Sequence, residues 1–359
     1  MSPALALAAA QRPRVALSLL GTGQVGSALL HQLAEGEERG ESLRIVSVAN
    51  SRRTLLDREG IHPREAVARL WAEGTGPSPE APLAALQQAG ADVRVIVDAT
   101  AAQQVAARHA HWLAQGVHVV SANKLAAGGT FSDWEALGRG AEIGNSRYGD
   151  AATVGAGLPA LSTLRRLRRA GDELVELAGV FSGSLSFLFN SWDGSVPFSS
   201  LLAEARQRGY TEPDPRADLC GRDVARKLLI VARAAGECLE ETDIAVEDLV
   251  PQALRDLPLD DFFLQAGALD EPLEARRRKA AASGQVLRYL ARLRRGERAT
   301  VRLEAVAPGH PCAQLSGADN LFAFTTRRYC QQPLVVRGPG AGPEVTAQAL
   351  LADVLEIAL

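Results

Sequence analysis

The chain has 359 residues, of which 47% are hydrophobic and 23% are charged. These proportions are typical of a folded globular protein and exclude a disordered or fibrous one. At roughly 100–200 residues per domain, the length predicts two domains. The 39 Lys and Arg against 42 Asp and Glu give a net charge of -3. This balance argues against a nucleic-acid-binding protein, which usually carries a basic excess.

Cysteine spacing and apolar runs indicate the compartment. The four cysteines, at positions 220, 238, 312 and 330, form no CxxC pair, so neither a zinc site nor a disulfide framework is predicted. No apolar run reaches the ~20 residues of a membrane span. Residues 1–14 carry no basic segment before their apolar stretch, which argues against a secretory signal and favours an N-terminal extension. A cytoplasmic protein without a membrane partner is expected.

The first half of the chain alternates predicted strands and helices. Apolar strands are predicted over Val15–Leu20, Leu43–Ala49, Val93–Ala99 and Val117–Ser121. Helices are predicted after the first strand, over Ala101–Gln115, and in a segment that ends before Gly144. Strands separated by helices form a parallel sheet that is buried on both faces. The pattern predicts an open α/β, Rossmann-type nucleotide-binding domain of about 150 residues.

The second half mixes helices with more polar strands. Helices are predicted over Leu161–Arg169, Ser199–Arg208 and Gly221–Ala235, and a last helix over Thr346–Leu359 after a glycine-rich turn at Gly338–Gly342. Strands are predicted over Glu173–Ser182, Val286–Leu293, Thr300–Val306, Asn320–Thr325 and Pro333–Arg337. This texture predicts an α+β substrate domain with a mixed sheet and helices on one face.

A GxGxxG motif at Gly21, Gly23 and Gly26 follows the first strand and opens the first helix. In that setting the glycines permit a tight turn, backbone approach to a pyrophosphate, and close packing of helix on strand. The helix N-terminus then offers free N–H groups to phosphate. A dinucleotide site is therefore predicted, although a purely structural turn is the alternative interpretation.

The end of the second strand indicates which dinucleotide is preferred. An NAD site usually places a carboxylate there to hold the ribose 2′-hydroxyl. The residues present are Asn50-Ser51-Arg52-Arg53, and a guanidinium binds a 2′-phosphate in bidentate fashion. NADP is therefore expected in preference to NAD, unless Arg52 and Arg53 simply point to solvent.

Lysine is scarce: only three of the 39 basic residues are Lys, at positions 124, 227 and 279. Lys is a compact ammonium whose pKa can shift, whereas Arg stays protonated. Lys124 follows the fourth strand, at the edge of the sheet where ligands bind in such folds. Lys279, in the run RRRK, is interpreted as part of a solvated helix face. The two other lysines are candidate functional residues. The alternative, that a lysine rather than an arginine stands there by chance, is given about equal weight for each.

The segment GYTEPDPRADLCGRDVARK, residues 209–227, combines several carboxylates with one of the three lysines. Glu212 and Asp218 are expected in a loop broken by prolines, and Asp223 and Lys227 share a helix face at i and i+4. Three carboxylates can hold a substrate ammonium beside a lysine that moves a proton. The alternatives are a surface ion pair and acidic residues that favour a helix start.

The Ser/Gly segment Phe181–Ser186 follows a predicted strand. It fits a carboxylate-binding turn and an ordinary helix N-cap equally well.

In this order, the motifs GTGQVG, VDAT, ANK, TVGAGLP, FSGSLS, GYTEPDPRADLCGRDVARK and RGPGAG resemble those of homoserine dehydrogenases. The similarity is greatest to the dehydrogenase half of bifunctional aspartokinase–homoserine dehydrogenases, and it covers the chain from about Arg14 onward. It implies NAD(P)-dependent interconversion of L-homoserine and L-aspartate 4-semialdehyde, a step from aspartate toward threonine, methionine and isoleucine.

The resemblance also implies a cofactor site and the domain limits. Residues 1–150 would form the dinucleotide-binding domain, completed by 338–359, and residues 151–337 the catalytic and dimerisation domain of a homodimer. Together with the glycine motif and the two arginines, the implied cofactor residues are Gln24, Val25, Thr100, Lys124, Gly340 and Thr346.

The implied substrate site comprises Glu212, Asp218, Asp223, Ser184 and Tyr210, with Lys227 as acid/base and Lys124 as a second catalytic lysine. Hydride transfer puts negative charge on the carbonyl oxygen, which an ammonium can stabilise.

The family also holds a sodium ion by backbone carbonyls, which here would belong to Val154, Ala156 and Leu158. The acidic residue that the family places two positions before TVGAGLP is replaced by Ala151, with Asp150 one place earlier, so one metal contact departs from the pattern. The 359 residues are expected to contain neither a kinase nor a C-terminal ACT domain, and weak or absent threonine inhibition through such a domain is expected.

Two other functions remain open on the residues alone. Another NAD(P)-dependent dehydrogenase of an amino-acid intermediate would share the cofactor domain but lack the acidic cluster before Asp223. A nucleotide-binding sensor without turnover would bind cofactor, and the retention of Lys227 and Asp223 argues against it.

Overall fold

The computed structural model describes residues 13–38 and 43–358, so that most of the expected N-terminal extension lies outside the described residues. The chain packs into two compact units. Among the described residues, the first comprises residues 13–38, 43–126, 132–152 and 346–358, and the second comprises residues 127–131 and 153–345. Residues 338–345, expected in the first domain, therefore pack with the second unit instead.

The first unit is built on a six-stranded sheet in the order β3-β2-β1-β4-β5-β6. Its strands are β1 (Val15–Leu20), β2 (Leu43–Ala49), β3 (Thr54–Leu56), β4 (Val93–Asp98), β5 (His118–Ser121) and β6 (Tyr148–Gly149). Five of them run parallel. Four of these, β1, β2, β4 and β5, were expected, and their apolar runs are largely buried because helices cover both faces. The two-residue β6 was not expected. The three-residue β3 pairs antiparallel with β2 and makes the sheet mixed.

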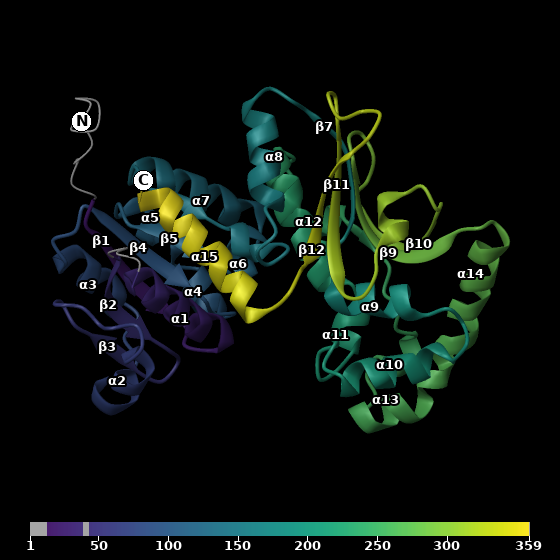
Figure 1. Cartoon of the computed structure of the whole chain (residues 1–359), viewed down its shortest axis with the longest axis horizontal. Coiled ribbons are helices and arrows are strands. Elements are labelled where there is room, and N and C mark those ends of the chain that lie inside the picture. The colour runs from purple at the N-terminus through teal and green to yellow at the C-terminus, as the bar shows by residue number, and fades with distance from the viewer. Residues whose placement is uncertain (1–12, 39–42, 359) are drawn as a thin grey trace, which may run out of the picture. The chain divides into compact units, whose positions relative to one another are not determined.

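The helices of the first unit carry most of the remaining core. They are α1 (Gln24–Glu38), α2 (Ala66–Glu73), α3 (Ala81–Gln88), α4 (Gln103–Ala106), α5 (His109–Ala114), α6 (Lys124–Ala127), α7 (Phe131–Ile143) and α15 (Pro343–Ala358). The single helix expected over 101–115 is divided into α4 and α5. Figure 1 shows the C-terminal helix α15 in yellow among the purple and blue elements that open the chain, and its apolar side joins their core.

The second unit contains a mixed sheet in the order β12-β11-β7-β9-β10-β8. Its strands are β7 (Leu174–Val180), β8 (Ala245–Val246), β9 (Val286–Arg294), β10 (Thr300–Val306), β11 (Asp319–Thr326) and β12 (Leu334–Pro339). All neighbours are antiparallel except β8 and β10, which are parallel. The expected mixed sheet is therefore confirmed. Strand β8 was not predicted, because a strand of two residues shows no alternation of apolar and polar side chains.

Seven α-helices of the second unit were assigned among the described residues: α8 (Ala160–Arg169), α9 (Gly183–Ser191), α10 (Phe198–Gln207), α11 (Arg216–Leu219), α12 (Arg222–Ala235), α13 (Leu259–Gln265) and α14 (Asp270–Ala282). Helix α12 is buried over most of its length. It begins after Gly221, whose φ of +71° favours glycine. A Cβ there would lie 2.0 Å from the Tyr289 hydroxyl oxygen, so only glycine fits at this position before α12.

Among the helices that the structure describes, each is too short or too polar to cross a lipid bilayer.

Candidate functional site

A pocket of about 530 Å³ opens at the carboxyl ends of β1, β2 and β4 in the first unit. This edge of a parallel sheet is where ligands bind in open α/β folds. The lining includes Gly21, Gly23, Asn50, Ser51 and Thr100, together with an apolar floor of Pro82, Val105 and Trp112. Arg108, which sequence reasoning did not single out, also lines the pocket and forms an ion pair with Glu80.

The glycine turn has no room for side chains at two of its three glycines. Gly21 has φ +96°, and a Cβ there would lie 2.7 Å from the Ala99 carbonyl oxygen; a Cβ at Gly26 would lie 1.9 Å from the Gly21 carbonyl oxygen. At Gly23 nothing lies within 4 Å, so the backbone there is open to a ligand. Gln24 and Val25 begin α1, whose N-terminal N–H groups attract phosphate.

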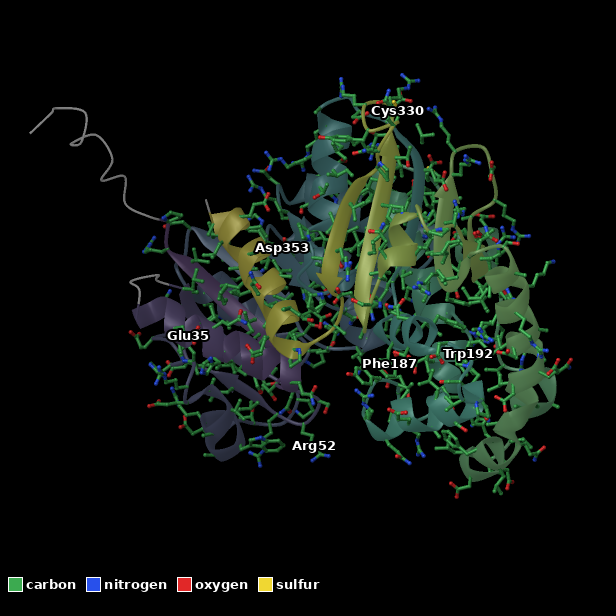
Figure 2. The ribbon with its side chains drawn as sticks, turned by 45° about the vertical axis from the view of Figure 1, so that its right-hand side comes forward. Glu35, Arg52, Phe187, Trp192, Cys330 and Asp353 are labelled. Atoms are coloured by element: carbon green, nitrogen blue, oxygen red, sulfur yellow. The ribbon has the colours of Figure 1, made fainter. Side chains whose placement is uncertain are left out.

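The two arginines in the turn after β2 differ in their side-chain contacts. The Asn50 side-chain oxygen accepts hydrogen bonds from the backbone N–H groups of Arg52 and Arg53, each at 2.9 Å. The Arg53 guanidinium donates to the Gly74 carbonyl at 2.9 Å and lies over the Trp71 ring. The Arg52 guanidinium has no partner among the described residues and is exposed (Figure 2). Arg52 is thus the arginine free to meet a phosphate, and the expectation for Arg53 is weakened.

Two further predicted cofactor residues lie in the first unit but do not line this pocket. Lys124 begins α6 directly after β5, at the same edge of the sheet as Thr100. Thr346 lies in the first turns of α15, on the part of that helix that belongs to the first unit.

In the second unit, Lys227 is held on α12 with its ammonium fixed at two points. Nζ donates to the Phe181 carbonyl oxygen at 2.7 Å and forms an ion pair with Asp223 Oδ2 at 2.9 Å. The Lys227 side chain is 11% exposed, whereas that of Asp223 is 46% exposed. The pair is therefore not a solvated surface pair: a buried ammonium is presented beside an accessible carboxylate.

Asp218 is expected in a loop, but it lies on the four-residue helix α11. Its Oδ1 accepts from the Ser184 hydroxyl at 2.7 Å, and its Oδ2 accepts from the Glu212 backbone N–H at 2.9 Å. Burial raises the pKa of Asp218, and the negative charges of Glu212 and Asp223 raise it further, against the effect of these two hydrogen bonds. The structure thus brings three other predicted substrate residues, Ser184, Glu212 and Asp223, close to the Asp218 carboxylate.

Tyr210, the fifth predicted substrate residue, stacks on Phe187 with ring centroids 4.0 Å apart. The Arg208 guanidinium lies over both rings and donates to the Tyr210 hydroxyl at 3.4 Å. This stack positions the tyrosine just before the turn that carries Glu212.

The loop between Tyr210 and α12 is anchored by a residue that sequence reasoning missed. Arg216 binds Asp214 through two nitrogens at 2.9 and 2.7 Å and donates to the carbonyls of Leu254, Arg255 and Leu257. These bonds hold the segment that presents Glu212 and Asp218. An Arg two places after an Asp gives no signal by itself, because its carbonyl partners lie far along the sequence.

The segment predicted to bind sodium forms a tight turn. Gly155 and Ala156 both have positive φ, +77° and +52°, a conformation that is rare for alanine. The Leu158 N–H bonds the Gly155 carbonyl at 2.9 Å. Among the described residues no cluster of His, Cys, Asp or Glu can hold a metal, so a cation here would depend on the carbonyl oxygens of Val154, Ala156 and Leu158.

Gly340 lies in the second unit, against a buried side chain that sequence reasoning missed. A Cβ at Gly340 would lie 2.0 Å from Asn320 Cγ. Asn320 is fully buried, and neither end of its amide has a hydrogen-bond partner among the described residues. Buried amides are nearly always paired. The turn around Gly340 therefore covers a polar group with unused hydrogen-bonding capacity.

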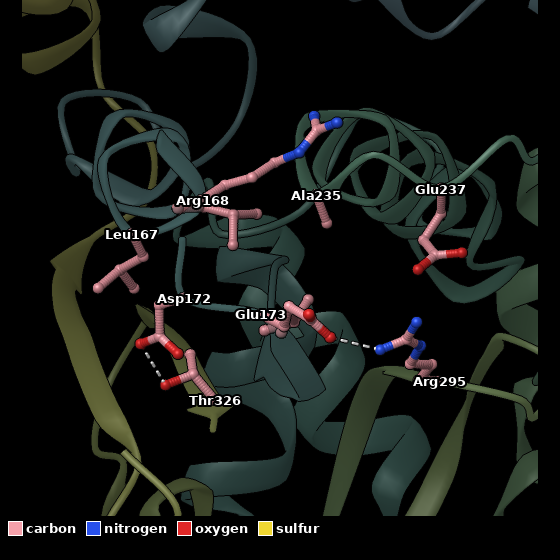
Figure 3. A pocket seen from close by; sticks show the side chains of 10 residues that line it. Leu167, Arg168, Asp172, Glu173, Ala235, Glu237, Arg295 and Thr326 are labelled. Carbon is pink, nitrogen blue, oxygen red and sulfur yellow. Dashed lines mark hydrogen bonds and ion pairs between the residues drawn. The ribbon is translucent and has the colours of Figure 1, made fainter. Parts of the chain in front are cut away.

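A smaller pocket, of about 160 Å³, lies near the ends of α8 and α12 in the second unit (Figure 3). Its polar groups largely satisfy one another. Glu173 accepts from Arg295 at 2.6 Å, and Asp172 accepts from the Thr326 hydroxyl at 2.7 Å. No predicted site residue lines it, and we interpret these pairs as structural.

Two family models match this chain. The model described as homoserine dehydrogenase matches residues 159–355, and the model described as homoserine dehydrogenase, NAD binding domain, matches residues 21–147.

Individual proteins are similar over nearly the whole chain. Bifunctional aspartokinase/homoserine dehydrogenase 1, chloroplastic, from Zea mays is 41% identical over 96% of this chain, which spans only 38% of the maize protein. Homoserine dehydrogenase from Emericella nidulans is 34% identical over 95% of this chain and 97% of the fungal protein. A solved structure from Candida auris, of a protein described as of unknown function, has a TM-score of 0.89 at 31% identity and covers 96% of this chain and 98% of its own.

Proposed function

The chain belongs to the homoserine dehydrogenase family, and we propose that it catalyses the NAD(P)-dependent interconversion of L-homoserine and L-aspartate 4-semialdehyde. This reaction leads from aspartate toward threonine, methionine and isoleucine. The observation that carries the proposal is the buried Lys227 ammonium, fixed by Phe181 and Asp223. Such an ammonium beside an acidic cluster suits a substrate that has both an α-ammonium and a reacting oxygen.

When bound, the nicotinamide supplies or accepts the hydride. In the reduction, negative charge develops on the aldehyde oxygen as the carbon is attacked. Lys227 stabilises this charge and gives a proton from Nζ to the new hydroxyl oxygen. The Phe181 carbonyl and the Asp223 carboxylate orient Nζ, so no reorganisation is needed when the charge appears. Lys124 is proposed as a second cation that polarises or positions the reacting groups.

The carboxylates of Glu212, Asp218 and Asp223 are proposed to bind the substrate α-ammonium. Asp218 is held by Ser184 and by the Glu212 backbone, so its orientation is set before substrate arrives. A positive substrate group would relieve the repulsion among the three negative charges. Fixing the substrate in this way lowers the entropic part of the barrier.

We propose NADP as the preferred cofactor, with NAD accepted less well. Gly21, Gly23 and Gly26 would approach the pyrophosphate, with Gln24 and Val25 at the start of α1. The free Arg52 guanidinium is the group proposed to bind the 2′-phosphate, since no carboxylate stands at the end of β2. Thr100, Lys124 and Thr346 of the first unit would complete the site, and Gly340 stays a predicted cofactor residue.

A sodium ion held by the carbonyls of Val154, Ala156 and Leu158 stays part of the proposal. The paired positive φ values at Gly155 and Ala156 support it, because they turn successive carbonyls away from regular helix or strand directions. The ion would stabilise this turn.

We also propose a homodimer formed through the sheet of the second unit. One face of that sheet carries a partly buried ladder in which Arg292 pairs with Glu176 and with Glu304. Charged groups of both signs on one sheet face suit pairing with a second copy, and light scattering would test it. A cytoplasmic location stays a prediction.

The reaction itself is tested by absorbance at 340 nm with purified protein, L-homoserine, and NADP⁺ or NAD⁺ in parallel. We expect formation of reduced cofactor that depends on homoserine and is faster with NADP⁺. A folded protein that binds NADPH but gives no signal with either cofactor would overturn the proposed activity. An equal rate with both cofactors would overturn the proposed preference alone.

A further inference from the structure

A carboxylate that takes no part in the proposed chemistry lies at the carboxyl end of β4. Asp98 is completely buried, and both of its oxygens accept hydrogen bonds. Oδ1 accepts from the Thr100 backbone N–H at 2.8 Å. Oδ2 accepts from Asn123 Nδ2 at 3.0 Å and bonds His109 Nε2 at 2.9 Å. One side chain therefore links the ends of β4 and β5 with helix α5.

The Asn123 side-chain amide connects Asp98 to the start of the helix that contains Lys124. Its Oδ1 accepts from the Leu125 backbone N–H at 3.1 Å, which is the N-cap arrangement for α6. Lys124 is the first residue of that helix. Asn123 Nδ2 also lies 3.1 Å from the Ala102 carbonyl and 3.4 Å from the Thr100 hydroxyl. The amide is thus fixed at both ends, by Asp98 on one side and by the helix start on the other.

Asp98 also contacts His109, which in turn contacts Tyr148. His109 is fully buried, and its Nδ1 lies 3.2 Å from the Tyr148 hydroxyl. An ionised carboxylate only accepts hydrogen bonds, so His109 Nε2 must donate to it. In neutral His109, Nδ1 is then the acceptor and Tyr148 the donor. Every polar atom in the line from Tyr148 to Asn123 has a defined partner.

We propose that Asp98 and Asn123 are positioning residues, which together hold Thr100 and Lys124 in one fixed arrangement at the nicotinamide end of the cofactor site. This inference rests on the proposed function for the roles of Thr100 and Lys124, but the restraint itself does not depend on it. Neither residue is among those proposed to bind substrate. They act because a free loop after β5 would let the Lys124 ammonium sample many positions, and a displacement of about 1 Å can cost on the order of a hundredfold in rate.

The substitution Asp98→Asn tests the arrangement with almost no change in shape. The new NH₂ group faces two other donors, Asn123 Nδ2 and His109 Nε2. His109 can change tautomer and accept, but Asn123 can accept only by turning its amide and giving up the cap on Leu125. We expect kcat to fall by about 10- to 100-fold and the KM for NADP⁺ to change by less than about threefold.

The substitution Asn123→Ser separates the cap from the link to Asp98. A serine oxygen still caps the helix start but is too short to reach Asp98, so kcat should fall in the same direction as in Asp98→Asn. It also serves as the test if Asp98→Asn fails to fold. Asp92→Asn is the matched control, because Asp92 precedes the other end of β4 and binds the exposed Arg14. It should leave kcat unchanged.

A double-mutant cycle distinguishes positioning from general damage. If Asp98 acts through Lys124, adding Asp98→Asn to Lys124→Ala should lower kcat by less than about twofold further, because coupled residues are not additive. A full additional loss in the double mutant would overturn the proposal.

Amide hydrogen exchange gives a readout that does not need turnover. Asp98→Asn should speed exchange across residues 122–127, above all at the Leu125 amide, while the strand β1 keeps its protection. If the protein proves to have no homoserine dehydrogenase activity, the proposed function fails but this measurement still decides the restraint. Unchanged exchange at 122–127 would overturn it.

Discussion

Two carboxylates, one fully buried and one half-buried, show how a group built into the fold differs from one that is proposed to bind a ligand. In the first unit, the oxygens of Asp98 are bonded by a backbone N–H, an amide and an imidazole. In the second unit, Asp218 has two donors and stands near two further carboxylates, and its pKa is raised. Burial alone does not mark a binding residue. What distinguishes Asp218 is the like charge of Glu212 and Asp223 nearby, and its proposed role is to bind a cationic group that would offset this repulsion.

The same contrast divides the two arginines after β2. Arg53 is committed to the Gly74 carbonyl and to the Trp71 ring, whereas Arg52 has no partner among the described residues. The sequence presents them as equivalent neighbours, but only one is available for an anion.

The largest effect is expected at Lys227, whose ammonium is both buried and proposed to react. Lys227→Ala should lower kcat/KM for homoserine by about a hundredfold or more, the range for loss of a general acid. Steady-state rates at 340 nm measure this. Lys279→Ala is the matched control, since that lysine is exposed on α14, and it should change nothing. A loss below tenfold in Lys227→Ala would show that another group supplies the proton.

Asp218→Asn should act mainly on substrate binding. The variant keeps its hydrogen bonds, because the Ser184 hydroxyl can turn from donor to acceptor, but it loses the charge that would hold the α-ammonium. We expect the KM for homoserine to rise by about 10- to 100-fold, the value of a charge-assisted hydrogen bond of about 1.5–3 kcal/mol. The KM for NADP⁺ should stay unchanged. An unaltered homoserine KM would place the ammonium elsewhere.

Arg52→Ala and Arg53→Ala should separate binding from stability. Arg52→Ala should raise the KM for NADP⁺ by about tenfold with little change for NAD⁺, because a charge-assisted bond to the 2′-phosphate is lost. Arg53→Ala should instead lower the free energy of unfolding by about 1 kcal/mol through loss of the bond to Gly74. Kinetics with both cofactors and denaturant unfolding of each variant measure the two effects. The reverse pattern would show that the free guanidinium is not the phosphate ligand.

The smallest expected effect is a stabilisation by the same Asp218→Asn change. A carboxyl whose folded-state pKa is raised contributes stability below its unfolded pKa and loses that contribution as pH rises through the folded value. At pH 7 the ionised Asp218 therefore costs stability, and asparagine should raise Tm slightly there. The gain should shrink toward acidic pH, where Asp218 is protonated. Calorimetry between pH 4 and 7 checks the trend, and a lower Tm at pH 7 would show that Asp218 is structural like Asp98.

The pattern of buried strands in the first unit was predictable because parallel strands covered on both faces are continuous apolar runs. The break between α4 and α5 was not, since residues 101–115 contain no Gly or Pro to end a helix. At this break His109 bonds Asp98 at the carboxyl end of β4. No local sequence pattern reveals that contact. Likewise, helix α11, which contains Asp218, has only four residues and is too short to show a hydrophobic periodicity.

Within the candidate site, the residue types near Lys227 were visible in the sequence because they lie within one short segment. The bonds that orient them were not visible, because their partners are distant: Phe181 for Lys227, Ser184 for Asp218, and the carbonyls around Leu254 for Arg216. Sequence reasoning selected the groups that are proposed to react and missed most of the groups that hold them.

Helix α15 sets the order in which the molecule can be completed during synthesis. Its apolar residues Ala347, Leu350 and Val354 belong to the core that contains Val15 and Leu17 of β1. The whole second unit is translated between these segments. At about 5–20 residues per second, the opening strands wait on the order of ten seconds or more for the helix that seals them. During that interval the opening strands lack the helix that covers part of their core, and the inserted second unit has time to fold first.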